Sequence, residues 1–200
     1  MKKILLASNN PGKVHEIQTI LAEHDFLVIP QAEFDITEVE ETGLTFVENA
    51  IIKARHAAHA SGLPAIADDS GLEVDALEGA PGVYSARYAG ENATDAANNA
   101  RLLEALAQVP LERRSARFRC VMVYLRHPRD PSPLIAEGVW HGRILLEARG
   151  AAGFGYDPLF HVPERGCASA ELYAAEKNRI SHRGQALRAL ARALRERDAR

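Results

Sequence analysis

The sequence contains few of the residues that mark disulfide-rich or metal-cluster proteins. Its 200 residues include two cysteines, two methionines and one tryptophan. Cys120 and Cys167 form no C-x-x-C motif, so they do not suggest a zinc site. Unpaired thiols suit a reducing cytoplasm, although two cysteines do not by themselves exclude a disulfide.

Targeting and membrane segments are missing too. The first apolar run ends at Ser8 after about five residues, whereas the apolar region of a signal peptide needs roughly 7–15. No stretch approaches the about 18 consecutive apolar residues of a membrane-spanning helix. We therefore expect a cytoplasmic protein that is neither secreted nor bound to a membrane.

A basic excess and a Walker A loop are absent as well. The net charge of -3 argues against broad binding to nucleic acid or to a membrane surface, which usually needs a basic balance. It leaves room for a small anionic ligand held by a few local cations. The sequence has no G-x-x-x-x-G-K-[ST] stretch, which counts against the P-loop kinases.

The order of apolar segments predicts an α/β fold. A chain of residues 1–200 fits one domain, with room for two lobes. Apolar runs and alternation predict strands over residues 2–7, 26–30, 64–68, 72–76, 116–126, 135–140 and 143–146. Helical spacing predicts helices after Gly12, after Thr45, over 95–109 and from Ser181, with the stripe Leu187, Leu190 and Leu194. Strands and helices alternate early and strands then cluster, which favours a mixed sheet.

The first strand runs into Ser8-Asn9-Asn10-Pro11-Gly12-Lys13, which has the ingredients of a phosphate-binding loop. A hydroxyl, two amides, a flexible glycine and a lysine can hold phosphate oxygens, and anions are favoured near a helix N-terminus. Pro11 has no N–H and cannot donate to a phosphate. The residues alone leave two interpretations open, an ordinary strand-to-helix turn or a loop that holds an anion.

The helix after Thr45 is the most clearly marked element. Thr45 and Glu48 form a capping box, and Gly62 is expected to end the helix. The face predicted to be buried carries Val47, Ile51, Ala54 and Ala58. The opposite face is predicted to display Asn49, Lys53 and His56. Lys53 is therefore a candidate phosphate partner, with an ordinary surface lysine as the alternative.

The stretch Asp68-Asp69-Ser70-Gly71 places two carboxylates at the end of an apolar strand. Adjacent strand residues point to opposite faces, but a turn at Gly71 would bring both carboxylates to one site. They could there hold Mg²⁺ and take a proton from water. The alternative is a plain Asx turn. Glu41, at the end of an acidic run, becomes a metal-ligand candidate only if the fold brings it to this pair.

The stretch Gly153-Phe154-Gly155-Tyr156-Asp157 suits a nucleotide base. Its glycines would let backbone N–H groups approach a ligand, Phe154 could stack on a base, and Asp157 could accept from a ring N–H. A tight hairpin with a buried aromatic residue is the alternative.

Lys177, His182 and Arg183 form a late basic group. Cations in the first turn of a helix oppose the helix dipole, so a nearby anion or an electron-rich carbonyl is a reasonable partner. An exposed basic turn would give the same pattern.

Taken together, these stretches resemble the inosine triphosphate pyrophosphatase family, also called dITP/XTP pyrophosphatases. The resemblance covers nearly the whole chain, and Ser8 stands where many members have threonine. It is carried by residues 8–13, Glu41-Thr-Gly-Leu-Thr-Phe46-Val-Glu-Asn49-Ala-Ile-Ile-Lys53, residues 67–71, Gly79-Ala-Pro-Gly-Val-Tyr-Ser-Ala-Arg-Tyr88, residues 153–157 and Ser181-His182-Arg183.

The resemblance implies a fold, a reaction and an assembly. The fold would be a long bent mixed β-sheet flanked by helices, with an active-site cleft between two lobes. The reaction would be hydrolysis of ITP, dITP and XTP to the monophosphate and pyrophosphate, with Mg²⁺ as cofactor. The partner would be a small-molecule nucleotide, with no nucleic acid and no membrane, and the protein would be a homodimer.

The resemblance also assigns roles to residues. The triphosphate would be held by Ser8, Asn9, Asn10, Pro11, Gly12, Lys13 and Lys53, with Asn10 and Lys13 as the main side-chain contacts. Glu41 and Asp69 would hold the metal. Asp69, with Asp68 as the alternative, would orient or deprotonate the attacking water. The nucleotide and base pocket would contain Ser70, Phe154, Gly155, Tyr156, Asp157, Lys177, His182 and Arg183.

The chemistry of such a reaction agrees with these residue types. Cleavage between the α- and β-phosphates requires neutralisation of the charge on the leaving pyrophosphate, which Mg²⁺ and lysines supply. Arg183 and His182 can donate to a 6-oxo group, whereas the 6-amino group of adenine would leave buried donors unpaired. The exclusion of guanine, which also has a 6-oxo group, must come from its 2-amino side.

Two other functions remain as alternatives at this stage. One is a nucleotide kinase or nucleotidyl transferase, against which the absent Walker A loop counts. The other is a non-catalytic nucleotide sensor, against which the intact acids Glu41, Asp68 and Asp69 count.

Overall fold

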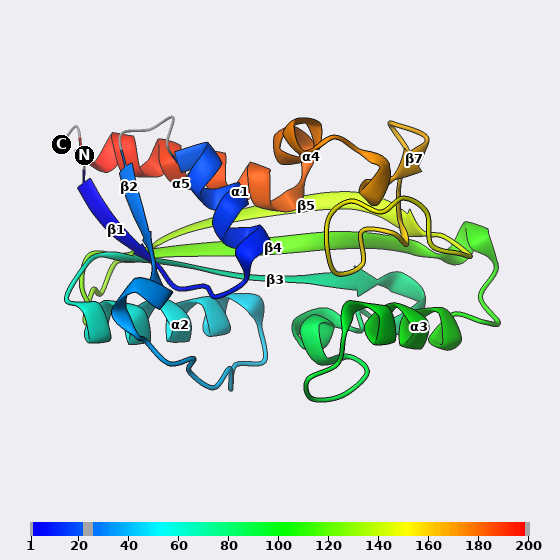
Figure 1. The fold of residues 1–200 in the computed structure, drawn as a ribbon, viewed down its shortest axis with the longest axis horizontal. Helices are drawn as coiled ribbons and strands as arrows, with labels where there is room; N and C mark the ends of the chain where they lie inside the picture. The colour runs from blue at the N-terminus through cyan, green and yellow to red at the C-terminus, as the bar shows by residue number, and fades with distance from the viewer. Residues whose placement is uncertain (1, 22–25, 199–200) are drawn as a thin grey trace. The chain divides into compact units, whose positions relative to one another are not determined.

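The computed structural model describes residues 2–21 and 26–198. Within them a seven-stranded sheet has the order β2-β1-β3-β4-β5-β6-β7 (Figure 1). The strands are β1 (Lys2–Leu6), β2 (Phe26–Pro30), β3 (Ala65–Val74), β4 (Ser115–Leu125), β5 (Leu134–Ile144), β6 (Phe160–Val162) and β7 (Cys167–Ala168). β1 is parallel to β2 and β3, whereas β5 and β6 are antiparallel. The sheet is mixed, and the predicted α/β class is confirmed.

The helices follow the predicted order, with one addition. They are α1 (Pro11–Leu21), α2 (Phe46–Ser61), α3 (Asp95–Ala105), α4 (Ala174–Ile180) and α5 (His182–Asp198). The predicted capping box of α2 is confirmed, because Thr45 Oγ1 accepts from the Glu48 N–H and the Glu48 carboxylate accepts from the Thr45 N–H. The short helix α4 was not expected. In the described residues no helix is both long and apolar enough to cross a membrane.

The chain divides into two compact units. The first contains Met1–Asp69, Cys120–Gly138 and His182–Arg200, and the second contains Ser70–Arg119 and Val139–Ser181. Each unit holds one of the two cysteines, and neither is in a disulfide, so the alternative that was left open is decided against a bridge. The cleft implied by the family resemblance stays a prediction.

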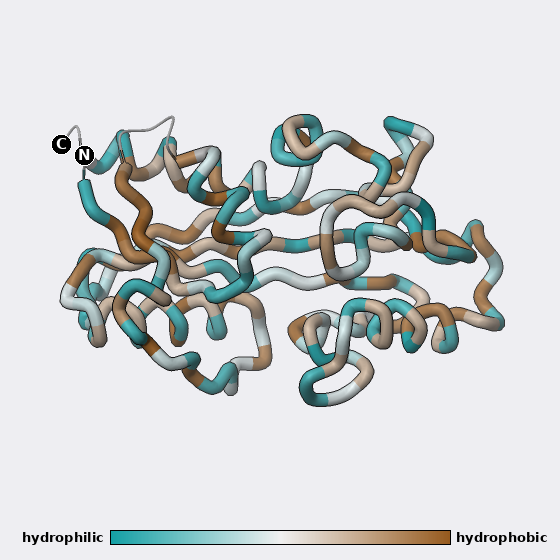
Figure 2. Tube along the Cα trace, in the orientation of Figure 1, coloured by the Kyte–Doolittle hydropathy of each residue, from teal (hydrophilic) through white to brown (hydrophobic). Residues whose placement is uncertain are grey.

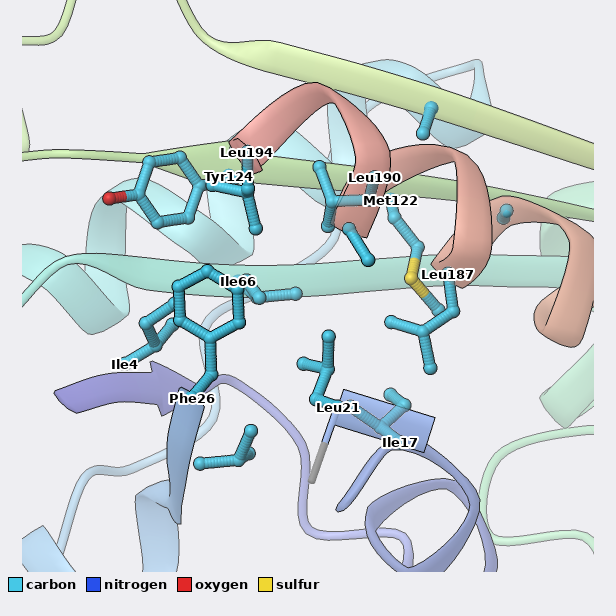
Figure 3. Close-up of a cluster of buried hydrophobic side chains, with 14 of the residues drawn as sticks. Ile4, Ile17, Leu21, Phe26, Ile66, Met122, Tyr124, Leu187, Leu190 and Leu194 are labelled. Carbon is cyan, nitrogen blue, oxygen red and sulfur yellow. The ribbon is translucent and has the colours of Figure 1, made fainter. Parts of the chain in front are cut away.

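In the first unit, α1 and α5 lie on one side of the strands and α2 lies on the other (Figure 1). Figure 3 shows the core on the α1 and α5 side, where Leu187, Leu190 and Leu194 face Ile17 and Met122. Burying a side chain of this size contributes about 1.5–3 kcal/mol. The predicted apolar stripe of α5 is therefore confirmed, and hydrophobic and hydrophilic segments alternate along this helix in Figure 2.

The second unit has its own core, built around aromatic rings. The ring centroid of Phe160 lies 4.5 Å from that of Phe118 and 5.1 Å from that of Trp140. Leu102 of α3 and Tyr156 belong to the same cluster. The loop at residues 153–157 is therefore attached to a packed core through one of its own side chains.

Two predicted strand boundaries are wrong. β3 does not break at Asp69-Ser70-Gly71 but runs unbroken over Ala65–Val74. β5 is one strand over Leu134–Ile144 rather than two. Gly142 lies where a Cβ would be 2.4 Å from the carbonyl oxygen of His161, so this glycine reflects close approach of β6 and not the end of a strand.

The predicted faces of α2 also need correction. Asn49, predicted on the polar face, is fully buried, and Val47 and Ile51, predicted to be buried, are only partly covered. The buried residues of α2 are Phe46, Asn49, Ala50, Ala54, Ala57 and Ala58. The side-chain oxygen of the buried Asn49 accepts a hydrogen bond from the Gly43 N–H at 2.8 Å, while its Nδ2 has no hydrogen-bond partner.

Candidate active site

The loop between β1 and α1 is organised as a helix N-cap. Asn10 Oδ1 accepts from the Lys13 N–H at 3.0 Å, and Pro11 takes the first helical position, where its missing N–H costs nothing. Ser8 Oγ accepts from the Asn10 N–H, and the Asn9 side chain donates to Glu38. The cap uses the oxygen of the Asn10 amide, so an anion would be met by side-chain donors such as Lys13 Nζ.

A buried ion cluster of the first unit joins α1, β3 and α5. Lys13 Nζ lies 2.9 Å from Asp68 Oδ2, and Arg183 Nε lies 3.7 Å from the same oxygen. Arg183 Nη1 donates to Glu16 Oε2 at 2.5 Å. The Arg183 side chain is 3% exposed, so the interpretation as an exposed basic turn is wrong. Burial alone would lower the pKa of Arg183, but Asp68 and Glu16 raise it, so the guanidinium stays charged.

A second ion cluster joins the loop before α2, α2 itself and β3. Lys53 Nζ donates to Glu41 Oε1 at 2.9 Å and to Asp69 Oδ1 at 2.8 Å. The other Asp69 oxygen, Oδ2, is buried and has no hydrogen-bond partner. Glu41 was a candidate metal ligand only if the fold brought it to the two aspartates. The fold brings it to one of them, Asp69, and both carboxylates contact the same ammonium group.

Asp68 and Asp69 belong to different clusters. Consecutive residues of a strand point to opposite faces, and β3 is unbroken here. Asp68 therefore meets Lys13 and Arg183, while Asp69 meets Lys53. The predicted turn that would bring both carboxylates to one site is wrong. Asp69 shares the ammonium group of Lys53 with Glu41.

The electrostatics of the second cluster favour a protonated lysine beside a proton-accepting carboxylate. Burial alone would lower the pKa of Lys53, but Asp69, Asp68 and Glu41 outweigh it and raise the pKa. Burial raises the pKa of Asp69 above the usual aspartate range, against the opposing charge of Lys53. A carboxylate with a raised pKa is a better proton acceptor at neutral pH than an exposed one.

The donor set of the second cluster fits a hard divalent cation. Glu41 and Asp69 offer carboxylate oxygens, and Asp69 Oδ2 is a buried acceptor that lacks a partner. Among residues 2–21 and 26–198, no group of three or more His, Cys, Asp or Glu side chains is arranged to hold a metal. Mg²⁺ does not require one, because it usually takes one or two carboxylates and completes its shell with water and phosphate oxygens.

The loop that carries Glu41 is fixed to the first turn of α2. Besides the bond from the Gly43 N–H to Asn49, the Glu48 carboxylate accepts from the N–H groups of Leu44 and Thr45. A Cβ at Gly43 would lie 2.6 Å from Glu48 Cβ and 2.7 Å from Asn49 Oδ1. Only glycine fits at this close contact. The hydrogen bonds hold the loop against α2, and they would be lost if the loop moved away.

In the second unit, Asp157 holds its own loop together. Its carboxylate accepts from the Phe154 N–H at 2.9 Å, from Ser169 Oγ at 2.8 Å and from Lys177 Nζ at 2.7 Å. A Cβ at Gly153 would lie 2.1 Å from Asp157 Oδ2, which explains the glycine. Asp157 is therefore engaged within the protein, and its predicted bond to a base N–H stays a prediction.

The two aromatic residues of this loop have different surroundings. Tyr156 is buried, its hydroxyl donates to the Ser85 carbonyl at 2.9 Å, and burial raises its pKa. Phe154 is only partly buried, and Lys177 Nζ lies 4.9 Å from its ring centroid. Tyr156 thus supports the loop from the core, and the predicted stacking of Phe154 on a base stays a prediction.

Two residues of these clusters, Glu16 and Ser169, have partners that are distant along the chain and could not be predicted from a local pattern. Glu16 follows Lys13 by three residues and lies on the same face of α1. Its partner Arg183 is 167 residues away in the sequence. Ser169, which donates to Asp157, lies in a turn that the sequence analysis did not single out. The helical spacing of Lys13 and Glu16 was the one signal that pointed to such a role. Ser70, predicted in the pocket, lies within β3 and is partly buried.

Comparison with known proteins gives a consistent family assignment. The model of the Ham1 family matches residues 4–193. A protein named dITP/XTP pyrophosphatase from Vibrio parahaemolyticus is 61% identical over 190 residues, which cover 95% of each chain. A protein of the same name from Thioalkalivibrio sulfidiphilus is 62% identical over 188 residues, which cover 94% of this chain and 96% of the relative.

Solved structures agree in fold. A HAM1 protein from Coxiella burnetii matches with a TM-score of 0.91 at 55% identity, and the match covers 98% of this chain and 100% of that one. The Ham1 protein of Staphylococcus aureus matches with a TM-score of 0.87 at 44% identity, with the same coverage.

Proposed function

This chain belongs to the Ham1 family, and we propose that it hydrolyses non-standard purine nucleoside triphosphates, ITP, dITP and XTP, to the monophosphate and pyrophosphate. Relatives named dITP/XTP pyrophosphatase support this class of enzyme. One structural observation carries the proposal. Lys53 joins the carboxylates of Glu41 and Asp69 in a partly buried group where one Asp69 oxygen has no partner.

Asp69 is proposed to accept the proton of the attacking water. The water oxygen would form a bond to the α-phosphorus while the bond from this phosphorus to the bridging oxygen of the β-phosphate breaks, which releases pyrophosphate. The unpartnered Asp69 Oδ2 can orient the water, and its raised pKa favours proton transfer. Asp69 is preferred to Asp68 because it shares Lys53 with Glu41, the second proposed metal ligand.

The lysines are proposed to stabilise the negative charge that grows on the phosphates. Lys53 stays protonated, since its three acidic neighbours raise its pKa, and Lys13 projects from the start of α1. Fixed cations in a partly buried site require little reorganisation during the reaction. Ser8, Asn9, Asn10 and Gly12 would complete this phosphate-binding segment.

Mg²⁺ is the proposed cofactor, and Glu41 and Asp69 would be the residues that hold it. When bound, it would supply positive charge to the phosphate oxygens and polarise the reacting groups. Lys53 contacts both carboxylates and offsets part of their negative charge, so we expect the site to remain folded without the ion.

Arg183 is proposed to recognise the 6-oxo group of the base, together with His182. Arg183 keeps its charge because Asp68 and Glu16 raise its pKa, and a guanidinium can only donate hydrogen bonds. An adenine amino group in that place would oppose donor to donor, which can reduce the rate by about 10⁴-fold. Phe154 is proposed to stack on the base, and Lys177 and Asp157 would hold its loop.

The assignment can be tested with a product assay. The purified protein is incubated with Mg²⁺ and, separately, ITP, XTP, GTP and ATP, and pyrophosphate and orthophosphate are both measured. We expect pyrophosphate from ITP and XTP and hardly any from ATP. Orthophosphate instead would place the attack at the terminal phosphate and contradict the mechanism. Binding of ITP without either product would favour a nucleotide sensor.

The family resemblance also suggests the oligomeric state of the enzyme and its location in the cell. We propose a cytoplasmic homodimer that acts on the free nucleotide pool. Analytical ultracentrifugation at micromolar concentration tests the dimer, and a monomer at every concentration would contradict it.

A further inference from the structure

Gly155 is held at both of its peptide groups by one helix. Its N–H donates to Asp95 Oδ2 at 2.7 Å, and its carbonyl accepts from Asn99 Nδ2 at 2.8 Å. Asp95 and Asn99 lie one turn apart at the start of α3, and 60 and 56 residues before Gly155. Neither residue belongs to the site described above.

The two side chains form a rigid pair. Asn99 Nδ2 also donates to the Asp95 carbonyl at 2.7 Å, which fixes the amide over the first turn of α3. Thr94 caps this helix by accepting from the Ala97 N–H. The carboxylate of Asp95 is favourably placed at a helix N-terminus, where negative charge is stabilised. The contact to Gly155 is therefore built on an ordered helix end.

α3 also holds the segment that receives Tyr156. Asn98, next to Asn99, accepts from the Ala89 N–H at 2.9 Å and donates to the Ala86 carbonyl at 3.0 Å. Ala86 belongs to the short 3-10 helix Gly82–Arg87. Ser85 lies in the same helix, and its carbonyl accepts from the Tyr156 hydroxyl. Neighbouring residues of α3 thus fix the loop directly at Gly155 and indirectly at Tyr156.

Phe154 is bounded by these anchors. On one side its own N–H is bound to Asp157, and on the other side comes Gly155, with φ 61°. The Phe154 ring lies beside Lys177, whose Nζ is 4.9 Å from the ring centroid. The direction of the ring depends on the peptide between residues 154 and 155, which donates to Asp95.

We propose that Asp95 and Asn99 are positioning residues that orient Phe154 for stacking on the purine base, an inference that rests on the proposed function. They touch neither the phosphates nor the attacking water. Their loss weakens base binding and leaves the chemical step intact, so it raises KM and changes kcat little.

The test compares Asp95→Ala and Asn99→Ala with two controls. Asp95→Asn keeps an oxygen that can accept from Gly155, and Glu104→Gln removes a charge from an exposed pair with Arg101 on the same helix. The measurements are kcat and KM for ITP, the dissociation constant of inosine monophosphate, and amide hydrogen exchange at Gly155. Inosine monophosphate carries the base but no scissile anhydride, so its binding does not depend on catalysis.

For each alanine variant we expect KM and the dissociation constant to rise about tenfold, the effect of losing one well-formed hydrogen bond. Exchange at Gly155 should quicken in Asp95→Ala, while both controls behave like the parent. Unchanged inosine monophosphate binding in both alanine variants would overturn the proposal, as would a loss of kcat without a change in KM. If Asp95→Ala does not fold, the comparison of Asn99→Ala with the control Glu104→Gln tests the proposal.

The same measurements separate this inference from the proposed function. A parent that binds inosine monophosphate but releases no pyrophosphate would refute the hydrolase. The dissociation constants of the variants would then decide the role of Asp95 and Asn99. A parent that binds no inosine nucleotide would overturn both.

Discussion

A single position along a strand decides which cation a carboxylate meets. Asp68 and Asp69 are adjacent and carry the same side chain, but the alternation of β3 directs them to different lysines. The Asp69 carboxylate pairs with Lys53, which also holds Glu41, whereas the Asp68 carboxylate pairs with Lys13 and lies near Arg183. The chemistry of the site therefore depends on strand register as much as on residue type.

The substitution Asp69→Asn should separate binding from turnover. It removes the proposed proton acceptor but keeps the shape of the side chain. We expect kcat for ITP to fall by about 10²–10⁴-fold, while ITP still binds. Steady-state kinetics together with isothermal titration measures both. The control is Glu40→Gln, an exposed carboxyl beside Glu41, and unchanged turnover in Asp69→Asn would remove Asp69 from the mechanism.

At the scale of elements, the contact between β5 and α5 has no spare room. A Cβ at Gly138 would lie 2.0 Å from the His182 carbonyl oxygen and 2.8 Å from the Ala186 N, and both are backbone atoms. We expect Gly138→Ala to lower the free energy of unfolding by about 1–3 kcal/mol, because α5 must move. Thermal unfolding measures it, with Ile135→Ala, a change at an exposed residue of the same strand, as the control.

Displacement of α5 by Gly138→Ala should also reach the site. His182 and Arg183 begin this helix, so the preference for ITP over ATP should fall together with stability. Full stability and full selectivity in Gly138→Ala would show that the helix start tolerates the added methyl group.

The turn between β4 and β5 predicts a pH dependence of stability. Asp130 accepts hydrogen bonds from the Arg126 side chain, the Arg126 N–H and the Ser132 N–H. These bonds lower the pKa of Asp130, and those from the Arg126 side chain make the largest contribution. A carboxyl with a lowered folded pKa stabilises the protein above its unfolded pKa of about 3.9 and loses this effect as the pH falls further.

Asp130→Asn should therefore be less stable than the parent at pH 7, by about 2 kcal/mol. The gap should narrow below pH of about 4, as the Asp130 carboxylate of the parent becomes protonated. Urea unfolding at several pH values checks this, with Arg129→Gln in the same turn as the control. A gap that stays constant with pH would contradict the explanation.

Local signals could be predicted from the sequence, whereas tertiary ones could not. The capping box at Thr45 and Glu48 was confirmed because both partners lie within one turn. The supposed break at Gly71 was wrong because sheet pairing overrides the turn propensity of a single Asp-Ser-Gly stretch. Asn49 was misplaced because its burial depends on one bond to a loop glycine.

The same division holds for the candidate site. The acids and lysines were predicted, but the pairing of each acid with its lysine was not, since it depends on the faces of β3. The partner of Arg183 lies on α1, at the opposite end of the chain, where no local pattern indicates it. Sequence thus predicts the residue types of this site, and the fold decides their partners.

At the scale of the whole molecule, stability and metal binding should be separable. The two hydrophobic clusters contain none of the proposed metal ligands, and Lys53 offsets part of the negative charge of Glu41 and Asp69 when no ion is bound. We expect EDTA to stop the release of pyrophosphate from ITP, and this loss should be reversible. The EDTA-treated protein should remain folded, with the same melting temperature as protein kept in buffer without added metal. Added Mg²⁺ should restore turnover and raise the melting temperature with concentration, as mass action requires for a ligand of the folded state. In Glu41→Gln the concentration of Mg²⁺ needed for either effect should rise, whereas Glu40→Gln should match the parent. Turnover that survives EDTA, or unfolding on metal removal, would contradict the proposed role of this partly buried group.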